Sequence, residues 1–230
     1  MIEPLNKEKI NAIKESNKKD LLLPFDCVYV LTLIDNQSRI YNFYEEMTKL
    51  GVANEIKQWN ACSHPHTNDI GKYLKDNGKY ILGSESYTAF NCTREHYNIC
   101  KDALYNGYDS ILVFEDDFQF IKYYDKIREL FQKPKPNGWN LIQYGHFRCS
   151  PFYNCKEIEY IPITNVNHDW GTMCYALSRG GVKYYINYMD SNYGVADYPL
   201  WNCYRHIDGA YQTTMNLWFP YINYESTIQV

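Results

Sequence analysis

The sequence lacks the short motifs that identify several large enzyme classes. It has no phosphate-binding loop of the type G-x-x-x-x-G-K-[ST], no dinucleotide-binding G-x-G-x-x-G, no G-x-S-x-G nucleophile turn and no H-E-x-x-H zinc motif. It also has no C-x-x-C pair, although it contains 8 cysteines. These absences argue against a P-loop nucleotidase, a dinucleotide-dependent dehydrogenase, a serine hydrolase and a zinc protease.

A basic surface and a long apolar run are also absent. The 23 Lys and Arg residues are outnumbered by 27 Asp and Glu residues, so the formal net charge is −4, which argues against a nucleic-acid partner. The longest apolar run, "CVYVLTLI", is too short to cross a membrane, and the first residues show no secretory pattern. We expect a soluble, cytoplasmic protein whose cysteines are reduced thiols.

The length of 230 residues suits one domain with a full hydrophobic core. We expect a lysine-rich extension at 1–24, in which Ile10 and Ile13 form one side of a short docking helix, and one domain at 25–230. The aromatic share of 17%, with 24 Tyr, suits either surfaces that meet sugars or a tyrosine-rich core.

The hydrophobic pattern alternates between strand-like and helix-like segments. Short apolar runs predict strands, and apolar residues at helical spacing predict helices. Strands are expected at 27–33, 55–61, 110–114, 139–145 and 171–178, and helices at 40–50, 84–107, 120–131 and 179–189. This alternation predicts an α/β fold with a mainly parallel central sheet.

Three consecutive acids, Glu115, Asp116 and Asp117, follow the apolar strand "SILVF". Ligands of open α/β sheets bind at the carboxyl ends of strands, and paired carboxylates there suit Mg²⁺ or Mn²⁺. Alternation along an extended chain predicts Glu115 and Asp117 on one side and Asp116 on the other. A solvated acidic turn, or acids at the start of a following helix, would explain the triplet without a metal.

One helix face carries Cys92, His96 and Cys100 at intervals of four residues. At a rise of about 1.5 Å per residue the two thiols lie about 12 Å apart, so one zinc ion cannot bind both. One cysteine with His96 could join a metal site, whereas a packed face with a hydrogen-bonded histidine is the simpler explanation.

Two other segments carry candidate site residues. Asp169 and Trp170 would suit a sugar ring, although Gly171 could simply turn the chain while Trp170 fills the core. Asp197, between aromatic residues, could be a general base or the N-cap of a helix that also carries His206, a candidate metal ligand.

Taken in order, these segments resemble glycosyltransferase family 25, which includes bacterial lipopolysaccharide glycosyltransferases and collagen galactosyltransferases. The similarity runs from about residue 27 to near the C-terminus and is carried by five segments. These are "CVYVLTLIDNQSR", "WNAC", "AFNCTREHYNICKDALYNGYDSILVFEDDF", "GTMCYALSRGGVKYYI" and "VADYPLW". The chain departs from the family pattern at Thr32, where asparagine is usual, and in a basic cluster reduced to Arg39.

The resemblance implies a GT-A-like fold, a nucleotide-sugar donor such as a UDP-sugar, Mn²⁺ or Mg²⁺, and metal-dependent inverting transfer of a hexose to a glycan or protein hydroxyl. It implies a catalytic role for Asp197 and metal binding at the acid triplet, and from the residue types we expect substrate contacts at 169–171. Residues expected near the nucleotide-sugar are Thr32, Leu33, Arg39, Ala61 and His96.

Two other functions remain open at this stage. A sugar nucleotidyltransferase would need a basic, glycine-rich loop after the first strand, and "IDNQSR" is poor in both features. A non-catalytic sugar- or nucleotide-binding domain derived from a transferase would keep the same sequence pattern without turnover.

Overall fold

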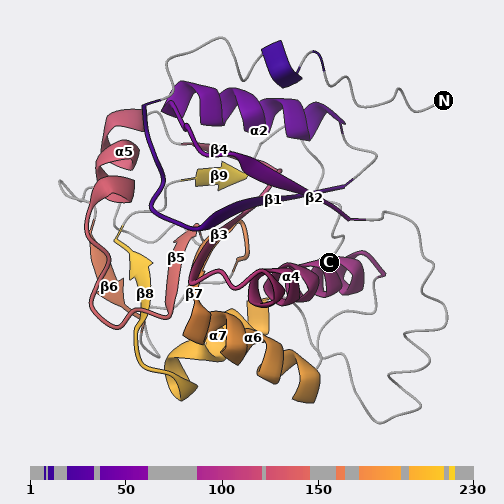
Figure 1. Cartoon of the computed structure of the whole chain (residues 1–230), viewed down its shortest axis with the longest axis vertical. Helices are drawn as coiled ribbons and strands as arrows, with labels where there is room; N and C mark the ends of the chain where they lie inside the picture. Colours follow the sequence, from indigo (N-terminus) through magenta and orange to yellow (C-terminus); the bar gives the residue numbers. More distant parts are fainter. Residues whose placement is uncertain are drawn as a thin grey trace.

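A computed structural model describes residues 8, 10–12, 20–33, 37–61, 87–120, 123–145, 159–163, 171–192, 197–214 and 218–220 (Figure 1). The large sheet contains β1 (Cys27–Leu33), β2 (Ile56–Ala61), β3 (Ser110–Glu115), β5 (Leu141–Gly145), β6 (Tyr160–Pro162), β7 (Cys174–Ser178) and β8 (Ala210–Thr213). A small sheet pairs β4 (Phe118–Phe120) with β9 (Trp218–Pro220). The longer helices are α2 (Gln37–Leu50), α4 (Tyr87–Tyr105), α5 (Tyr124–Gln132), α6 (Arg179–Ser191) and α7 (Asp197–His206).

The large sheet is mixed, with strand order β2-β1-β3-β7-β5-β8-β6. β2, β1 and β3 are parallel neighbours, β7 runs antiparallel to both β3 and β5, and β5 is parallel to β8. Five strands therefore share one direction, while β7 and β6 oppose them. The predicted α/β class is confirmed, and the sheet is parallel on its β2-β1-β3 side.

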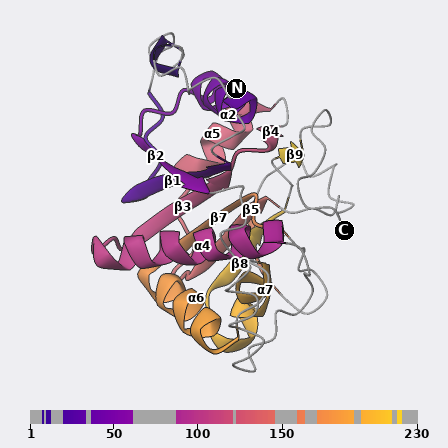
Figure 2. The same cartoon turned by 90° about the vertical axis from the view of Figure 1, so that its right-hand side faces the viewer.

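The alternating side chains of the strands supply two cores, one on each face of the sheet (Figure 2). In β1, Val28 and Val30 face the core shared with α2 and α5, whereas Tyr29 and Leu31 face the core shared with α4, α6 and α7. Helices on both faces explain why β1 and β3 read as nearly unbroken apolar runs, because neither face of these strands meets water.

The segment after the acid triplet differs from its prediction. A helix was expected at 120–131, but α5 begins at Tyr124 because Phe118–Phe120 pairs with β9 as a strand. The short segment Phe118–Phe120 matches either a helix turn or a short strand, and only the distant partner strand decides between them.

The last residues of the predicted N-terminal extension pack into the domain. Leu21 and Leu23 are fully buried, and the amides of Asp20 and Leu21 donate to the carbonyl of Gly51. Ile10 lies in a short helical segment and is buried as predicted, while Ile13 lies outside the described residues.

Two expectations about the whole chain can be compared with the described residues. None of their helices combines the length and the apolar character needed to cross a bilayer. Cysteines 27, 92, 100, 174 and 203 are in no disulfide, as expected, and the other three lie outside the described residues.

Candidate functional site: an acidic strand end against a cysteine–histidine helix face

The acid triplet lies where the carboxyl ends of β1 and β3 meet. The two strands are parallel, and their register sets Leu31 beside Glu115, so Thr32 comes next to Asp116. β7 begins at the same edge because it is antiparallel to β3, and the amide of Glu115 donates to the carbonyl of Met173 at 2.9 Å. The start of β7 therefore brings a third segment to the acids.

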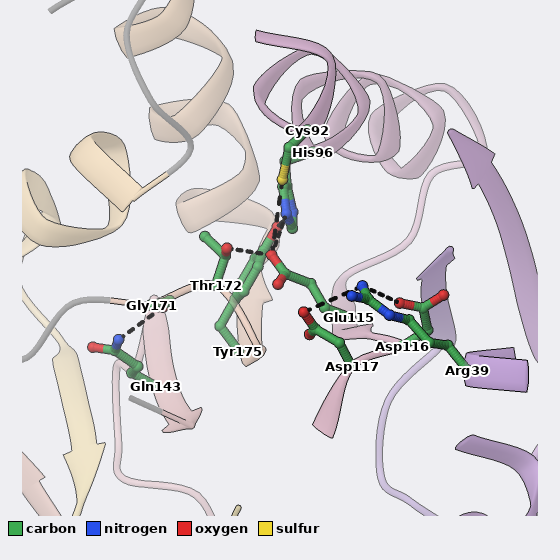
Figure 3. Close-up of polar contacts among 10 residues, drawn as sticks. All are labelled: Arg39, Cys92, His96, Glu115, Asp116, Asp117, Gln143, Gly171, Thr172 and Tyr175. Atoms are coloured by element: carbon green, nitrogen blue, oxygen red, sulfur yellow. Dashed lines mark hydrogen bonds and ion pairs between the residues drawn. The ribbon is translucent and has the colours of Figure 1, made fainter. Parts of the chain in front are cut away.

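Glu115 is held by side chains from α4 and from the start of β7 (Figure 3). Its Oε1 accepts hydrogen bonds from His96 Nε2 at 3.0 Å and from the hydroxyl of Thr172. Burial raises the pKa of Glu115, but the hydrogen bonds and charge of His96, with the Thr172 bond, outweigh it and lower the pKa below its ordinary value. Glu115 is therefore ionised and already has partners.

His96 is fully buried and is bonded through both ring nitrogens. Its Nδ1 lies 2.8 Å from the hydroxyl of Tyr175, and its Nε2 lies 3.0 Å from Glu115. Nε2–H donates to the carboxylate, because a carboxylate can only accept, whereas Nδ1 and the tyrosine hydroxyl can each donate or accept. The ring orientation is thus fixed by two elements outside its own helix.

Asp116 is buried, and each of its two carboxylate oxygens lies near a polar or positively charged side chain. Its Oδ2 accepts from the hydroxyl of Thr32, and its Oδ1 lies 3.8 Å from the guanidinium of Arg39. Arg39 comes from the first turns of α2 and is itself buried, so its charge is placed at the strand end rather than in solvent. Thr32 and Arg39, both predicted near the site, thus contact the acid triplet directly.

Asp117 is the least compensated of the three acids. Its Oδ2 is 3.5 Å from Arg39, whereas its buried Oδ1 has no hydrogen-bond partner among the described residues. Burial and the negative charges of Glu115 and Asp116 raise the pKa of Asp117 to about 7, although Arg39 opposes the shift. The Oδ1 of Asp117 is therefore available to bind a cation, and the neighbouring negative charges favour such binding.

The predicted sidedness of the triplet is wrong. Alternation would pair Glu115 with Asp117, but Asp116 and Asp117 both lie within 4 Å of Arg39, while Glu115 points toward His96 (Figure 3). The reason is local: the regular strand ends at Glu115, and the chain bends at the next two residues. Alternation holds only while the backbone is extended.

A group of potential metal ligands forms between α4 and β3. The Cys92 Sγ, a ring nitrogen of His96 and a Glu115 oxygen all lie within 4.8 Å of one another. His206 is not in this group. It is exposed in the last turn of α7, with its ring stacked on Tyr184 of α6, so its predicted role as a metal ligand stays a prediction.

The remaining predicted residues fall at the same sheet edge or outside the described residues. Leu33 and Ala61 end β1 and β2 and are register partners. Asp169 and Trp170 lie outside the described residues, and Asp197 is the first residue of α7, with a side chain that is not described. Their proposed substrate and catalytic roles stay predictions.

Gly171 turns the chain just before β7. Its φ of 131° lies in a region that side-chain-bearing residues rarely adopt, and its carbonyl accepts a 2.9 Å hydrogen bond from Gln143 Nε2 of β5. This conformation supports the turn interpretation of Gly171. A substrate contact at this position stays a prediction.

Sequence reasoning missed three residues that hold the site. Thr172 and Tyr175 fix Glu115 and His96, and the buried carboxylate of Glu46 accepts from the amide of Phe120, which ties β4 to α2. For Cys92 and His96, in contrast, the four-residue spacing in the sequence indicates that both side chains lie on one face of a helix. No sequence signal links Glu46 to a segment 74 residues away.

A search against protein-family models finds no match to this chain.

Proposed function

We propose that this protein is a metal-dependent glycosyltransferase with a GT-A-like fold, similar to family 25. It would move a hexose from a nucleotide-sugar, such as a UDP-sugar, to a hydroxyl of a glycan or protein acceptor, with inversion at the sugar carbon. The observation that carries the proposal is Asp117: a carboxylate with a raised pKa and a buried oxygen without a hydrogen-bond partner among the described residues.

The position of the acids adds support. They follow β3 in the parallel part of the sheet, where the carboxyl ends of β2, β1 and β3 share one edge. Ligands of open α/β sheets bind outside this edge. The candidate nucleotide-sugar residues Thr32, Leu33 and Ala61 lie at the same edge, at the ends of β1 and β2.

The donor set fits a hard divalent cation. Asp116 and Asp117 offer carboxylate oxygens, which Mg²⁺ and Mn²⁺ prefer, and Asp117 has an oxygen to spare. Such an ion, when bound, neutralises a diphosphate and the charge that develops on the leaving group. Glu115 is a weaker candidate ligand for this ion because its Oε1 already accepts from His96 and Thr172.

The proposed reaction is a single displacement. The acceptor oxygen forms a bond to the anomeric carbon while the bond from that carbon to the diphosphate oxygen breaks, and the nucleoside diphosphate leaves. Asp197 would take the proton from the acceptor hydroxyl, a contribution of about 10²–10⁴-fold to the rate. Arg39 would keep Asp116 and Asp117 together between catalytic cycles, because its guanidinium contacts both.

One observation favours a second candidate, a non-catalytic sugar- or nucleotide-binding domain. Arg39 already supplies a buried positive charge to Asp116 and Asp117, so the acids do not depend on a metal for all of their compensation. Calorimetry with a nucleotide-sugar, with and without Mn²⁺, read beside product formation, separates the two candidates. Binding without turnover favours the binding domain.

The test is a screen of nucleotide-sugars for Mn²⁺-dependent hydrolysis or transfer, followed by two matched variants. Asp117→Asn removes the carboxylate at the site, while Asp109→Asn makes the same chemical change on a side chain that is 81% exposed and precedes β3 at its opposite end. We expect Asp117→Asn to abolish metal-dependent turnover and Asp109→Asn to retain it. Full activity in a folded Asp117→Asn protein would refute the proposal.

A further inference from the structure

The face of α4 that meets β3 carries ligands of a different chemical kind from those at Asp116 and Asp117. Cys92 and His96 are one helical turn apart, so both side chains project toward the same partner, Glu115 at the end of β3 (Figure 3). The Cys92 Sγ is 3.9 Å and the His96 Nε2 is 3.0 Å from the same carboxylate oxygen. Three ligand types thus converge on one point.

We propose that Cys92, His96 and Glu115 bind a zinc ion, with a fourth coordination position left open. Thiolate and imidazole are ligands that select Zn²⁺, whereas Mg²⁺ and Mn²⁺ prefer oxygen alone. Tetrahedral bonds of about 2.0–2.3 Å place neighbouring ligand atoms about 3.3–3.8 Å apart. The three ligand atoms already lie within 4.8 Å of one another, so small side-chain movements complete the site.

The surroundings of the three side chains match those of zinc ligands. Tyr175 contacts His96 Nδ1 at 2.8 Å, and Thr172 donates to Glu115. Zinc-bound histidines commonly use their second ring nitrogen in such a hydrogen bond, which fixes the ring. The site is also accessible at its rim, because Cys92 is half-buried and the Glu115 side chain is 18% exposed, while His96 is fully buried.

Binding requires a defined proton rearrangement. The Cys92 thiol loses its proton to solvent, since the thiolate is the ligand. His96 Nε2 gives up its proton and the ring keeps one proton on Nδ1, which donates to the hydroxyl of Tyr175, so the Nε2 lone pair faces the ion. Zinc replaces the His96–Glu115 hydrogen bond and ties α4 to the end of β3.

The test of this site uses no nucleotide, so its outcome does not depend on the proposed sugar transfer. Wild type and two cysteine variants are purified from zinc-supplemented cultures under reducing conditions, dialysed, and measured for bound zinc. Cys92→Ala removes the ligand, and Cys100→Ala removes a buried sulfur two turns further along the same helix. We expect about one zinc ion per chain in wild type and Cys100→Ala, and none in Cys92→Ala. Equal zinc in all three proteins, or none in wild type, overturns the proposal.

Cobalt and a conservative variant test the ligands individually. Co²⁺ added to the metal-free protein should give a thiolate-to-cobalt charge-transfer band and the strong visible bands of tetrahedral cobalt. Cys92→Ala should lose the charge-transfer band. Tyr175→Phe keeps the aromatic ring and should weaken zinc binding about 10–100-fold, since it removes the partner of His96. A cobalt complex without the thiolate band, or unchanged zinc affinity in Tyr175→Phe, overturns the assignment.

Discussion

Replacing Asp117 with asparagine tests the electrostatics of the acid triplet without requiring a known substrate. The aspartate pKa rises from 3.8 to about 7 in the folded protein, since burial and two neighbouring carboxylates disfavour its charge. Below about pH 4 the side chain is protonated in both the folded and unfolded states. As the pH rises toward 7, the unfolded chain loses this proton while the folded protein keeps it, so the free energy of unfolding falls.

The magnitude follows from the size of the shift. A change of 7 − 3.8, or about 3 pH units, at 1.36 kcal/mol per unit sets a ceiling of about 4 kcal/mol. The Asp117 side chain is 33% exposed, so solvent screening reduces the effect, and we expect about 1–2 kcal/mol. Asparagine carries no such charge, so Asp117→Asn should gain this much stability relative to wild type between about pH 4 and pH 8.

The assay is urea unfolding of wild type, Asp117→Asn and Asp109→Asn across this pH range, in the presence of reductant and absence of divalent metal. The exposed Asp109 serves as the control, and its variant should follow the wild-type profile. A constant difference between wild type and Asp117→Asn at all pH values would refute the reasoning. Mn²⁺ at 100 times its dissociation constant should then stabilise wild type by about 2.7 kcal/mol and leave Asp117→Asn unchanged.

Four further substitutions probe the surroundings of the acids. Glu46→Ala removes the carboxylate that accepts from the buried amide of Phe120 and should lower the free energy of unfolding by about 1–3 kcal/mol. Lys49 forms an ion pair with Glu46 and its side chain is half-exposed, so Lys49→Ala should cost below about 1 kcal/mol; urea unfolding measures both changes. Gly171→Ala forces a side chain onto a φ of 131° and should cost about 1–3 kcal/mol, read from the same unfolding curves. Arg39→Gln removes the cation shared by the acids and should tighten Mn²⁺ binding at pH 8, measured by calorimetry; unchanged affinity would contradict the role given to Arg39.

Most elements of the fold could be predicted because their apolar patterns are local. The strand at residues 27–33 matches β1, and the predicted start of the helix after β7 matches α6 at Arg179. Errors concentrate where a partner far along the chain decides the outcome. The pairing of 118–120 with β9 and the antiparallel direction of β7 both depend on contacts that no local pattern encodes.

The candidate site could also be predicted only in part. The residue types were visible in the sequence: an acid triplet after an apolar strand, and a cysteine and histidine one turn apart on a helix. The partners Tyr175 and Thr172 were not visible, because they reach His96 and Glu115 from the segment around β7, and the pairing of Arg39 with the acids depends on how α2 packs. The bend after Glu115 also turned Asp117 toward Arg39, against the alternation rule.

By itself, the sequence determined the α/β class and the place of the acids at the end of a buried strand, because side-chain periodicity and chain order are local properties. The tertiary structure decided how each acid is compensated: His96 for Glu115, Arg39 for Asp116, and an incomplete set for Asp117. Charge compensation depends on distances of a few ångströms between segments remote in sequence, and only folding sets those distances.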